Sequence, residues 1–192
     1  MTPLPSADQA WLISEAPYDS PVARSLTRAL HREQTATYGR ADDPDTTEPA
    51  EFAPPNGAFL LAFRPDGTAL ACGGWRSASR TTAEIKRMYV SPAARGHGLG
   101  RQVLQALEDD ARRRGMSEVV LETGVSNLAA LALYADFGYG PIAPYVAGRD
   151  PRINRALGKA LGTPAEGPRS RRGCRSGGPG PARRPGRSGP VG

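Results

Sequence analysis

A glycine-rich loop at residues 95–101, with the sequence R-G-H-G-L-G-R, most constrains the fold of this chain. It follows a strand-like segment at residues 82–90 and leads directly into a pattern typical of an amphipathic helix. Gly96, Gly98 and Gly100 remove three Cβ atoms where the N–H groups at a helix start have no intrahelical partner. Such N–H groups and the helix dipole together bind phosphate. The loop therefore predicts an anion-binding site.

The spacing of the glycines distinguishes two classes of nucleotide-binding loop. The dinucleotide fingerprint is G-x-G-x-x-G in the first βα unit of a doubly wound sheet. Here the glycines alternate, and the loop lies about halfway along a chain of 192 residues. The half of the chain that remains is too short for the second half of a doubly wound sheet. The spacing therefore favours a different class of loop over the dinucleotide fingerprint.

Residues 95–100 instead match R/Q-x-x-G-x-G/A, and the chain resembles the GNAT superfamily of N-acetyltransferases, which bind acyl-coenzyme A with this loop. Two further blocks carry the resemblance. One is A-E-I-K-R-M-Y-V-S-P at residues 83–92. The other is N-x-x-A-x-x-L-Y-x-x-F-G-Y at residues 127–139. In this order and spacing, the three blocks extend the resemblance over residues 10–161.

The expected fold is α/β, with a mixed, mainly antiparallel central sheet and helices on both faces, the acyl-CoA N-acyltransferase fold. Period-two and period-3.6 patterns predict its elements. Strands are expected at residues 11–13, 58–63, 69–75, 82–90 and 118–123, and helices at 21–38, 99–114 and from a Ser126 cap to 137. The resemblance implies a final antiparallel pair, with residues 155–161 as the last strand. Residues 39–56 are predicted to be a loop with room for a short helical turn, and the resemblance implies that this segment borders the acceptor site.

The basic charge of the chain is concentrated after residue 162. Residues 163–192 hold seven arginines and one acid, whereas the first 162 residues hold 18 basic and 18 acidic residues. We expect one acetyltransferase domain at residues 1–162 and a disordered Arg/Gly/Pro-rich tail at residues 163–192. The tail has too few apolar residues to offset the entropy cost of ordering. We interpret it as inert rather than as a nucleic-acid arm.

Cysteine content and hydropathy exclude several other classes of protein. The two cysteines, Cys72 and Cys174, cannot build a disulfide framework or a metal cluster. We therefore expect no metal site. The sequence shows no signal-peptide pattern and no apolar run long enough to span a membrane. These observations indicate a cytoplasmic protein without a membrane partner.

The resemblance implies acetyl-CoA as co-substrate and an amine as acceptor. An amine with a lysine-like pKa of about 10.4 is neutral in only about one molecule in 2,500 at pH 7, a cost of roughly 4.6 kcal/mol. A general base must therefore remove its proton. Related members carry a glutamate in the A-E-I context, which assigns this role to Glu84, with burial expected to raise its pKa. Glu122 on the adjacent strand, water, or a purely structural Glu84 paired with its basic neighbours remain alternatives.

The resemblance also assigns the groups that act on the thioester. A backbone N–H that a bulge leaves free stabilises charge on the thioester oxygen in this family, and alignment of the block places that donor at Met88. Val90 lies close by and is expected to bind the pantetheine arm. Tyr134 is the expected general acid for the leaving thiolate. Asn127 is placed on the same helical face and is expected to contact the coenzyme.

The loop itself is expected to bind the pyrophosphate. The backbone supplies most donors, so the His97 side chain is expected to be inert, while the arginines on either side would add charge-assisted bonds. The complete predicted set is Arg95, Gly96, His97, Gly98, Leu99, Gly100 and Arg101.

The function predicted from these residues is direct acetyl transfer from acetyl-CoA to a primary amine of a small molecule, with a protein amine as the less favoured acceptor. Acidic residues at the presumed acceptor mouth would attract a cation: Asp42, Asp43, Asp45, Glu48 and Glu51. The alternatives are a non-catalytic acyl-CoA sensor and a module that binds nucleic acid through its tail. The oligomeric state is open, and a homodimer is compatible with the sequence.

Overall fold

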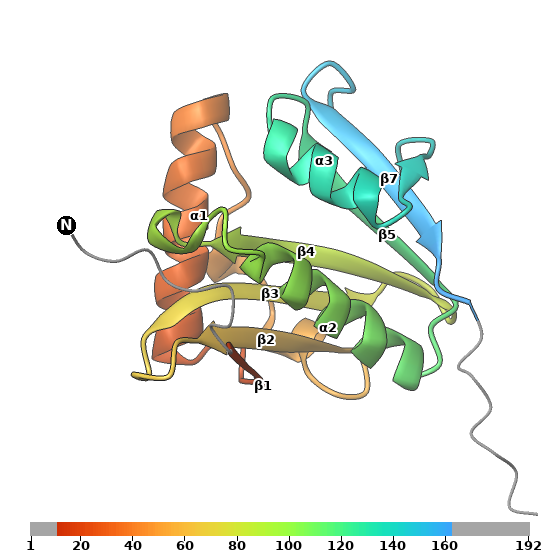
Figure 1. Ribbon diagram of the computed structural model, residues 1–192. Coiled ribbons are helices and arrows are strands. Elements are labelled where there is room, and N and C mark those ends of the chain that lie inside the picture. Colours follow the sequence, from red (N-terminus) through yellow and green to blue (C-terminus); the bar gives the residue numbers. More distant parts are fainter. Residues whose placement is uncertain (1–10, 163–192) are drawn as a thin grey trace, which may run out of the picture.

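The computed structural model describes residues 11–162 and shows one sheet of seven strands with helices on both faces (Figure 1). The strand order is β1-β2-β3-β4-β5-β7-β6, and only β4 and β5 pair in parallel. The strands are β1 (Leu12–Glu15), β2 (Gly57–Phe63), β3 (Ala69–Ser77), β4 (Thr82–Val90), β5 (Glu118–Gly124), β6 (Gly140–Pro141) and β7 (Asn154–Ala160). The predicted mixed, mainly antiparallel α/β fold is confirmed.

The helices begin and end at residues suited to capping. Helix α1 (Pro21–Tyr38) starts after Ser20, whose hydroxyl accepts the Ala23 N–H, and ends at Gly39 in the left-handed conformation. The other helices are α2 (Leu99–Arg113) and α3 (Leu128–Asp136), and short 3₁₀ turns occur at η1 (Pro44–Thr46), η2 (Pro49–Phe52) and η3 (Pro92–Ala94). The segment predicted as a loop with room for a short helical turn contains η1 and η2.

Alternation along β2 supplies a core on each face of the sheet. Ala58 and Leu60 face α2, where they join the cluster that contains Leu107, while Phe59 and Leu61 join the cluster on the α1 face. Successive strand residues point to opposite faces, so a wholly buried strand of this kind must be covered on both sides. The helices α1 and α2 provide this cover (Figure 1).

The central strands β4 and β5 pair over only part of their length. Their parallel ladder runs from Thr82 with Glu118 to Ile85 with Leu121. Beyond that point the two strands diverge, as Figure 1 shows. The divergence opens the middle of the sheet between the glycine loop on one side and the segment after α1 on the other.

A β-bulge lies on β4 within this divergent part. Arg87 and Met88 together face the single residue Gly73 of β3, which is the arrangement of a bulge. Arg87 has a φ of 59°, and no other non-glycine residue within 11–162 has a positive φ. The bulge lies where the resemblance places the Met88 oxyanion donor.

The structure corrects one expectation, the cap of α3, and leaves another, the tail, outside the described residues. The cap of α3 is Asn127 and not Ser126, because the Asn127 Oδ1 accepts the Ala130 N–H at 3.2 Å. The tail at residues 163–192 and Cys174 lie outside the described residues, so the domain boundary remains a prediction. No helix within residues 11–162 is long and apolar enough to cross a membrane.

One buried ion pair on the α2 face leads to a stability prediction. The Glu108 side chain is 1% exposed, and both its oxygens accept from the Lys159 Nζ, at 2.9 and 2.7 Å. Replacing Lys159 by methionine leaves a buried, unpaired carboxylate, so we expect a loss of about 3 kcal/mol in the free energy of unfolding. Urea denaturation measures this loss. The double variant Lys159→Met/Glu108→Leu should recover most of it, and a double variant as unstable as the single would contradict this explanation.

Candidate active site

The glycine loop presents the N-terminus of α2 without any side chain in front of it. Gly96 and Gly98 have positive φ values of 80° and 77°, and Gly98 is the N-cap of α2. No side chain caps this helix and its first turn contains no acidic residue, so the N–H groups of Leu99 and Gly100 are free to bind an anion. The Leu99 side chain is buried in the core, whereas that of His97 is exposed.

The two arginines beside the loop are paired with carboxylates of the same chain. Arg95 contacts Glu33 of α1 at 2.6 Å and donates from Nε to the Val90 carbonyl at 2.9 Å. Arg101 contacts Asp136 of α3 at 2.9 Å, with both side chains more than half exposed. A phosphate contact from either arginine would therefore compete with an existing pair. The backbone of the loop has no such competitor.

The proposed acid and the proposed oxyanion donor lie next to each other. The Tyr134 hydroxyl is 3.8 Å from the Met88 Sδ, so α3 places this hydroxyl at the bulge of β4. Burial raises the pKa of Tyr134 to about 12. The hydroxyl therefore stays protonated over the physiological range, but it is a weaker acid than an unperturbed tyrosine.

Asn127 lies directly before α3. Its side chain caps α3, because the Asn127 Oδ1 accepts the Ala130 N–H, and the expected contact with the coenzyme stays a prediction. Val90 does approach the loop, because a Cβ added to Gly100 would meet the Val90 and Leu133 side chains at 3.6 Å.

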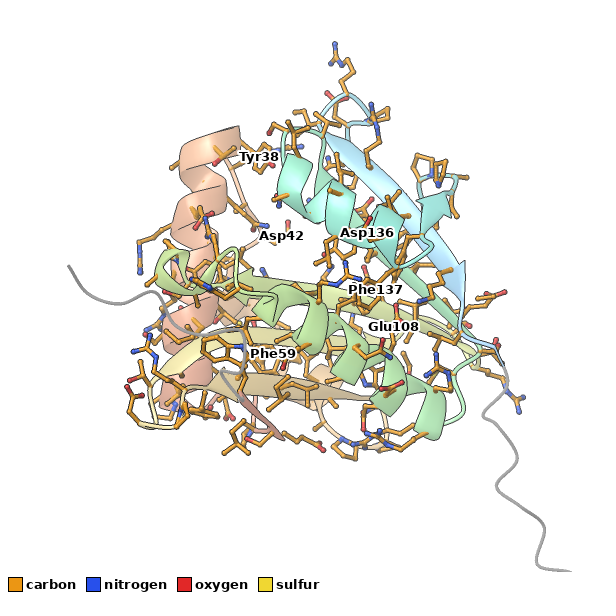
Figure 2. All side chains as sticks on the ribbon, in the orientation of Figure 1. Tyr38, Asp42, Phe59, Glu108, Asp136 and Phe137 are labelled. Carbon is orange, nitrogen blue, oxygen red and sulfur yellow. The ribbon has the colours of Figure 1, made fainter. Side chains whose placement is uncertain are left out.

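A cavity of about 450 Å³ opens on the other side of the divergent strands. Its walls come from the end of α1, the segment after it, β4, β5 and the segment before β7. In Figure 2, Tyr38 and Asp42 lie on the α1 side of this space. The polar residues that line the cavity are Gln34, Tyr38, Arg40, Asp42, Glu84, Lys86, Arg87, Glu122, Thr123, Arg149 and Asn154.

Glu84 lies on the cavity wall but is held by three partners. Its carboxylate accepts from Arg76 Nε at 2.7 Å, Tyr145 hydroxyl at 3.1 Å and Lys86 Nζ at 3.3 Å. Burial alone would raise the pKa of Glu84, but the charges of Lys86 and Arg76 outweigh it, and the pKa lies below its ordinary value. The expected rise in pKa is therefore wrong. Glu84 is a stable carboxylate.

Glu122 has the opposite properties. It is the first residue of β5 beyond the paired ladder, and one arginine, Arg149, contacts it at 3.1 Å. Burial raises the pKa of Glu122 above its ordinary value, although Arg149 and Lys86 partly oppose this. A carboxylate with a raised pKa that opens onto a cavity is suited to accept a proton.

The acidic residues near the cavity mouth are largely neutralised. Asp45 is paired with Arg24 and Arg28, and Asp42 is paired with Arg149. Glu51 contacts Arg76, and the Asp43 side chain accepts the backbone N–H of Asp45. Three of the five predicted acidic residues are therefore paired with arginines, and Asp42 alone of the five lines the cavity, so the attraction of a cation stays a prediction.

Sequence reasoning missed Arg149, Arg76 and Tyr145. Arg149 and Tyr145 belong to the segment between β6 and β7, which has no motif and no periodic pattern, and Arg76 is a polar residue near the end of a buried strand. Only the fold brings them to the carboxylates. Within residues 11–162, no three His, Cys, Asp or Glu side chains are grouped to hold a metal ion.

Comparison with known proteins agrees with this architecture. The model of the acetyltransferase (GNAT) family matches residues 23–139. The IAA acetyltransferase of Azospirillum brasilense is 43% identical over 104 residues, which are 52% of this chain and 66% of that protein. The [ribosomal protein bS18]-alanine N-acetyltransferase of Escherichia coli is 35% identical over 81 residues, 39% of this chain and 55% of that protein.

A solved structure extends the similarity over the whole fold. A Klebsiella pneumoniae protein assigned to the acyl-CoA N-acyltransferases superimposes with a TM-score of 0.69 and 28% sequence identity. The superposition covers 81% of this chain and 99% of that one. The region that the family model matches, residues 23–139, includes the glycine loop, the bulge on β4 and both central strands.

Proposed function

The chain belongs to the acetyltransferase (GNAT) family, and from this premise we propose that it transfers an acetyl group from acetyl-CoA directly to the primary amine of a small molecule. The observation that carries the proposal is the divergence of β4 and β5 after Ile85 and Leu121. Arg87 of the bulge and Glu122 both line the cavity beside this divergence, which supports placing the acetyl donor at the bulge and the acceptor in the cavity.

Acetyl-CoA is the acetyl donor of the family. The free N–H groups at the start of α2 would bind its pyrophosphate, and its thioester would lie at the bulge, where the Met88 N–H would donate to the carbonyl oxygen. The acceptor would approach from the cavity. Both substrates then meet at the opening between the strands, so transfer requires no covalent enzyme intermediate.

We assign the general base to Glu122 in preference to Glu84. The base must accept a proton from an ammonium group, and Glu84 is already saturated by Arg76, Lys86 and Tyr145. Glu122 has a single arginine partner and a raised pKa. The neutral amine would then attack the thioester carbonyl and form the C–N bond. As the tetrahedral oxyanion collapses, the C–S bond breaks, the surplus proton on nitrogen passes to water, and the thiolate leaves toward Tyr134.

Tyr134 supports departure of the thiolate. With its pKa at about 12, complete proton transfer to a thiolate of pKa about 8.5 is uphill by roughly 5 kcal/mol. This cost favours a hydrogen bond that strengthens as charge develops on sulfur, with the proton transferred late. The role of Tyr134 is therefore stabilisation of the leaving group first and protonation second.

The cavity supports a small acceptor. A volume of about 450 Å³ lies within the range of pockets for small molecules, and its polar lining suits an acceptor with hydrogen-bonding groups. A protein N-terminus is the second candidate, favoured by the similarity to the bS18-alanine enzyme. A panel that contains both small amines and peptides separates these two classes.

Acceptor-dependent release of free thiol from acetyl-CoA tests the function. We expect at least one amine of the panel to raise thiol release clearly above hydrolysis, with mass spectrometry detecting the acetylated amine. Tyr134→Phe should lower kcat about tenfold or more while coenzyme A affinity changes little. Tight coenzyme binding without turnover of any acceptor would favour the non-catalytic sensor instead.

A further inference from the structure

Arg87 connects the bulge of β4 to the segment that follows α1. Its guanidinium donates to the Asp42 carbonyl at 3.0 Å, the Asp43 carbonyl at 3.4 Å and the Thr47 hydroxyl at 3.0 Å. These three acceptors belong to one stretch, residues 42–47, which we name the acceptor-side loop. None of them is a carboxylate, so the role of Arg87 here is to hold backbone in place.

Arginine is an unusual residue for the backbone conformation at position 87. A φ of 59° is disfavoured for a residue with a long side chain, and glycine or asparagine is the usual solution at such a position. The Arg87 Nε is also buried without a hydrogen-bond partner. The positive φ and the unpartnered Nε are both unfavourable. We therefore infer that the three contacts of Arg87 with the loop offset these costs.

The acceptor-side loop continues the connection to the proposed base. The Asp42 carboxylate binds Arg149 through both oxygens, at 3.1 and 2.5 Å, and Arg149 also contacts Glu122 at 3.1 Å. A continuous series of contacts therefore runs from Arg87 through Asp42 and Arg149 to Glu122. Both ends of this series, Arg87 and Glu122, line the cavity.

We propose that Arg87 is a positioning residue that ties the acceptor-side loop to the bulge of β4, so that the acceptor cavity and the Met88 oxyanion donor are held in a fixed relation. The backbone of Arg87 shapes the bulge, and its side chain fixes the wall of the cavity. Acceptor and thioester are thereby aligned by a single residue that contacts neither reacting atom.

Other contacts limit the part of the loop that depends on Arg87. The end near η1 is held independently, since the Tyr18 hydroxyl donates to the Pro44 carbonyl and Asp45 is paired with Arg24 and Arg28. At Asp42, the carbonyl is also 3.2 Å from the His31 Nδ1. Loss of Arg87 should therefore loosen residues 40–43 and 47 rather than unfold the whole loop.

Two substitutions at Arg87 separate its side chain from its backbone. Arg87→Gly removes the side chain and accepts the positive φ, whereas Arg87→Ala removes the side chain and keeps the strain. If the side chain positions the loop, the amide of Thr47, whose N–H donates to the Pro44 carbonyl, should exchange about tenfold faster in both variants, as measured by hydrogen-exchange mass spectrometry. Wild-type exchange in Arg87→Gly would overturn the proposal.

Kinetics provide a second readout, which rests on the proposed function. For an acceptor that the wild-type protein acetylates, both variants should raise the acceptor KM about tenfold and leave the KM for acetyl-CoA unchanged. Equal weakening of both substrates would show a general structural role and contradict the proposal. If no acceptor is found, the exchange experiment still tests Arg87, so failure of the function and failure of this inference are distinguishable.

Thr47→Val provides a variant that leaves β4 untouched. It removes one of the three acceptors while preserving side-chain shape, so folding is not at risk even if both Arg87 variants fold poorly. We expect a smaller change of the same kind: faster exchange at residue 47 and a rise of about twofold to threefold in acceptor KM. An unchanged Thr47→Val protein, together with full activity in Arg87→Lys, would argue against the side-chain contacts.

Discussion

Replacing Glu122 by glutamine is expected to lower kcat/KM for the acceptor about 100-fold or more, because the amide cannot accept the proton of the ammonium group. In the wild-type protein the active form of Glu122 is the carboxylate, so activity should rise with pH through its pKa, which lies above the ordinary value of 4.5. Glu122→Gln should lose this rise. Rates measured from pH 5 to pH 9 at saturating acetyl-CoA test the prediction.

Glu84→Gln is the matched control, since both residues are glutamates on the cavity wall. Its lowered pKa keeps Glu84 ionised throughout this pH range, so the variant should retain the shape of the pH profile. It should also lower the melting temperature, because Arg76 and Lys86 lose the charge that they share. The reverse result, a flattened profile in Glu84→Gln and a wild-type profile in Glu122→Gln, would return the base to Glu84.

Gly98→Val is expected to abolish the stabilisation by coenzyme A. Gly98 is the N-cap of α2 and has a φ of 77°, a conformation that a β-branched residue strongly disfavours. The free N–H groups behind it would be displaced from the phosphate. For the wild-type protein, coenzyme A at about 100 times Kd should add about 2.7 kcal/mol, or roughly 5–10 °C in melting temperature, whereas nicotinamide dinucleotides should add nothing.

Two control substitutions separate binding from folding. Gly67 in the β2–β3 turn has a φ of 85° and open space around it, so Gly67→Val imposes similar backbone strain outside the loop and should retain the coenzyme shift. Gly100 has no positive φ, and an added Cβ makes only ordinary contacts, so Gly100→Ala should fold normally and bind with little loss. Absence of any shift in the wild-type protein would refute the assignment of the loop itself.

Local signals in the sequence were sufficient for most of the fold. The helices expected at residues 21–38 and 99–114 and the strands expected at 58–63 and 69–75 each depend on patterns of nearby residues, and α1, α2, β2 and β3 confirm them. The cap of α3 was placed one residue too early, because serine and asparagine are both good caps and only the backbone geometry selects Asn127.

Local signals in the sequence predicted only part of the candidate site. Motif residues such as Met88 and Tyr134 were found because they keep fixed offsets within a block, and the structure brings their side chains together. The charge states were not accessible. They depend on which distant cations reach each carboxylate, and Arg76, Arg149 and Tyr145 carry no local signal of their position.

The sequence by itself therefore determined the α/β architecture, the glycine-rich helix start and the family, since each follows from residue type and spacing along the chain. Tertiary structure alone decided that Glu84 is saturated, that Glu122 opens onto the cavity, and that Arg87 ties the acceptor-side loop to the bulge. The reason is physical. Burial and Coulomb energy depend on distances between residues far apart in the chain, and only the folded sheet sets those distances.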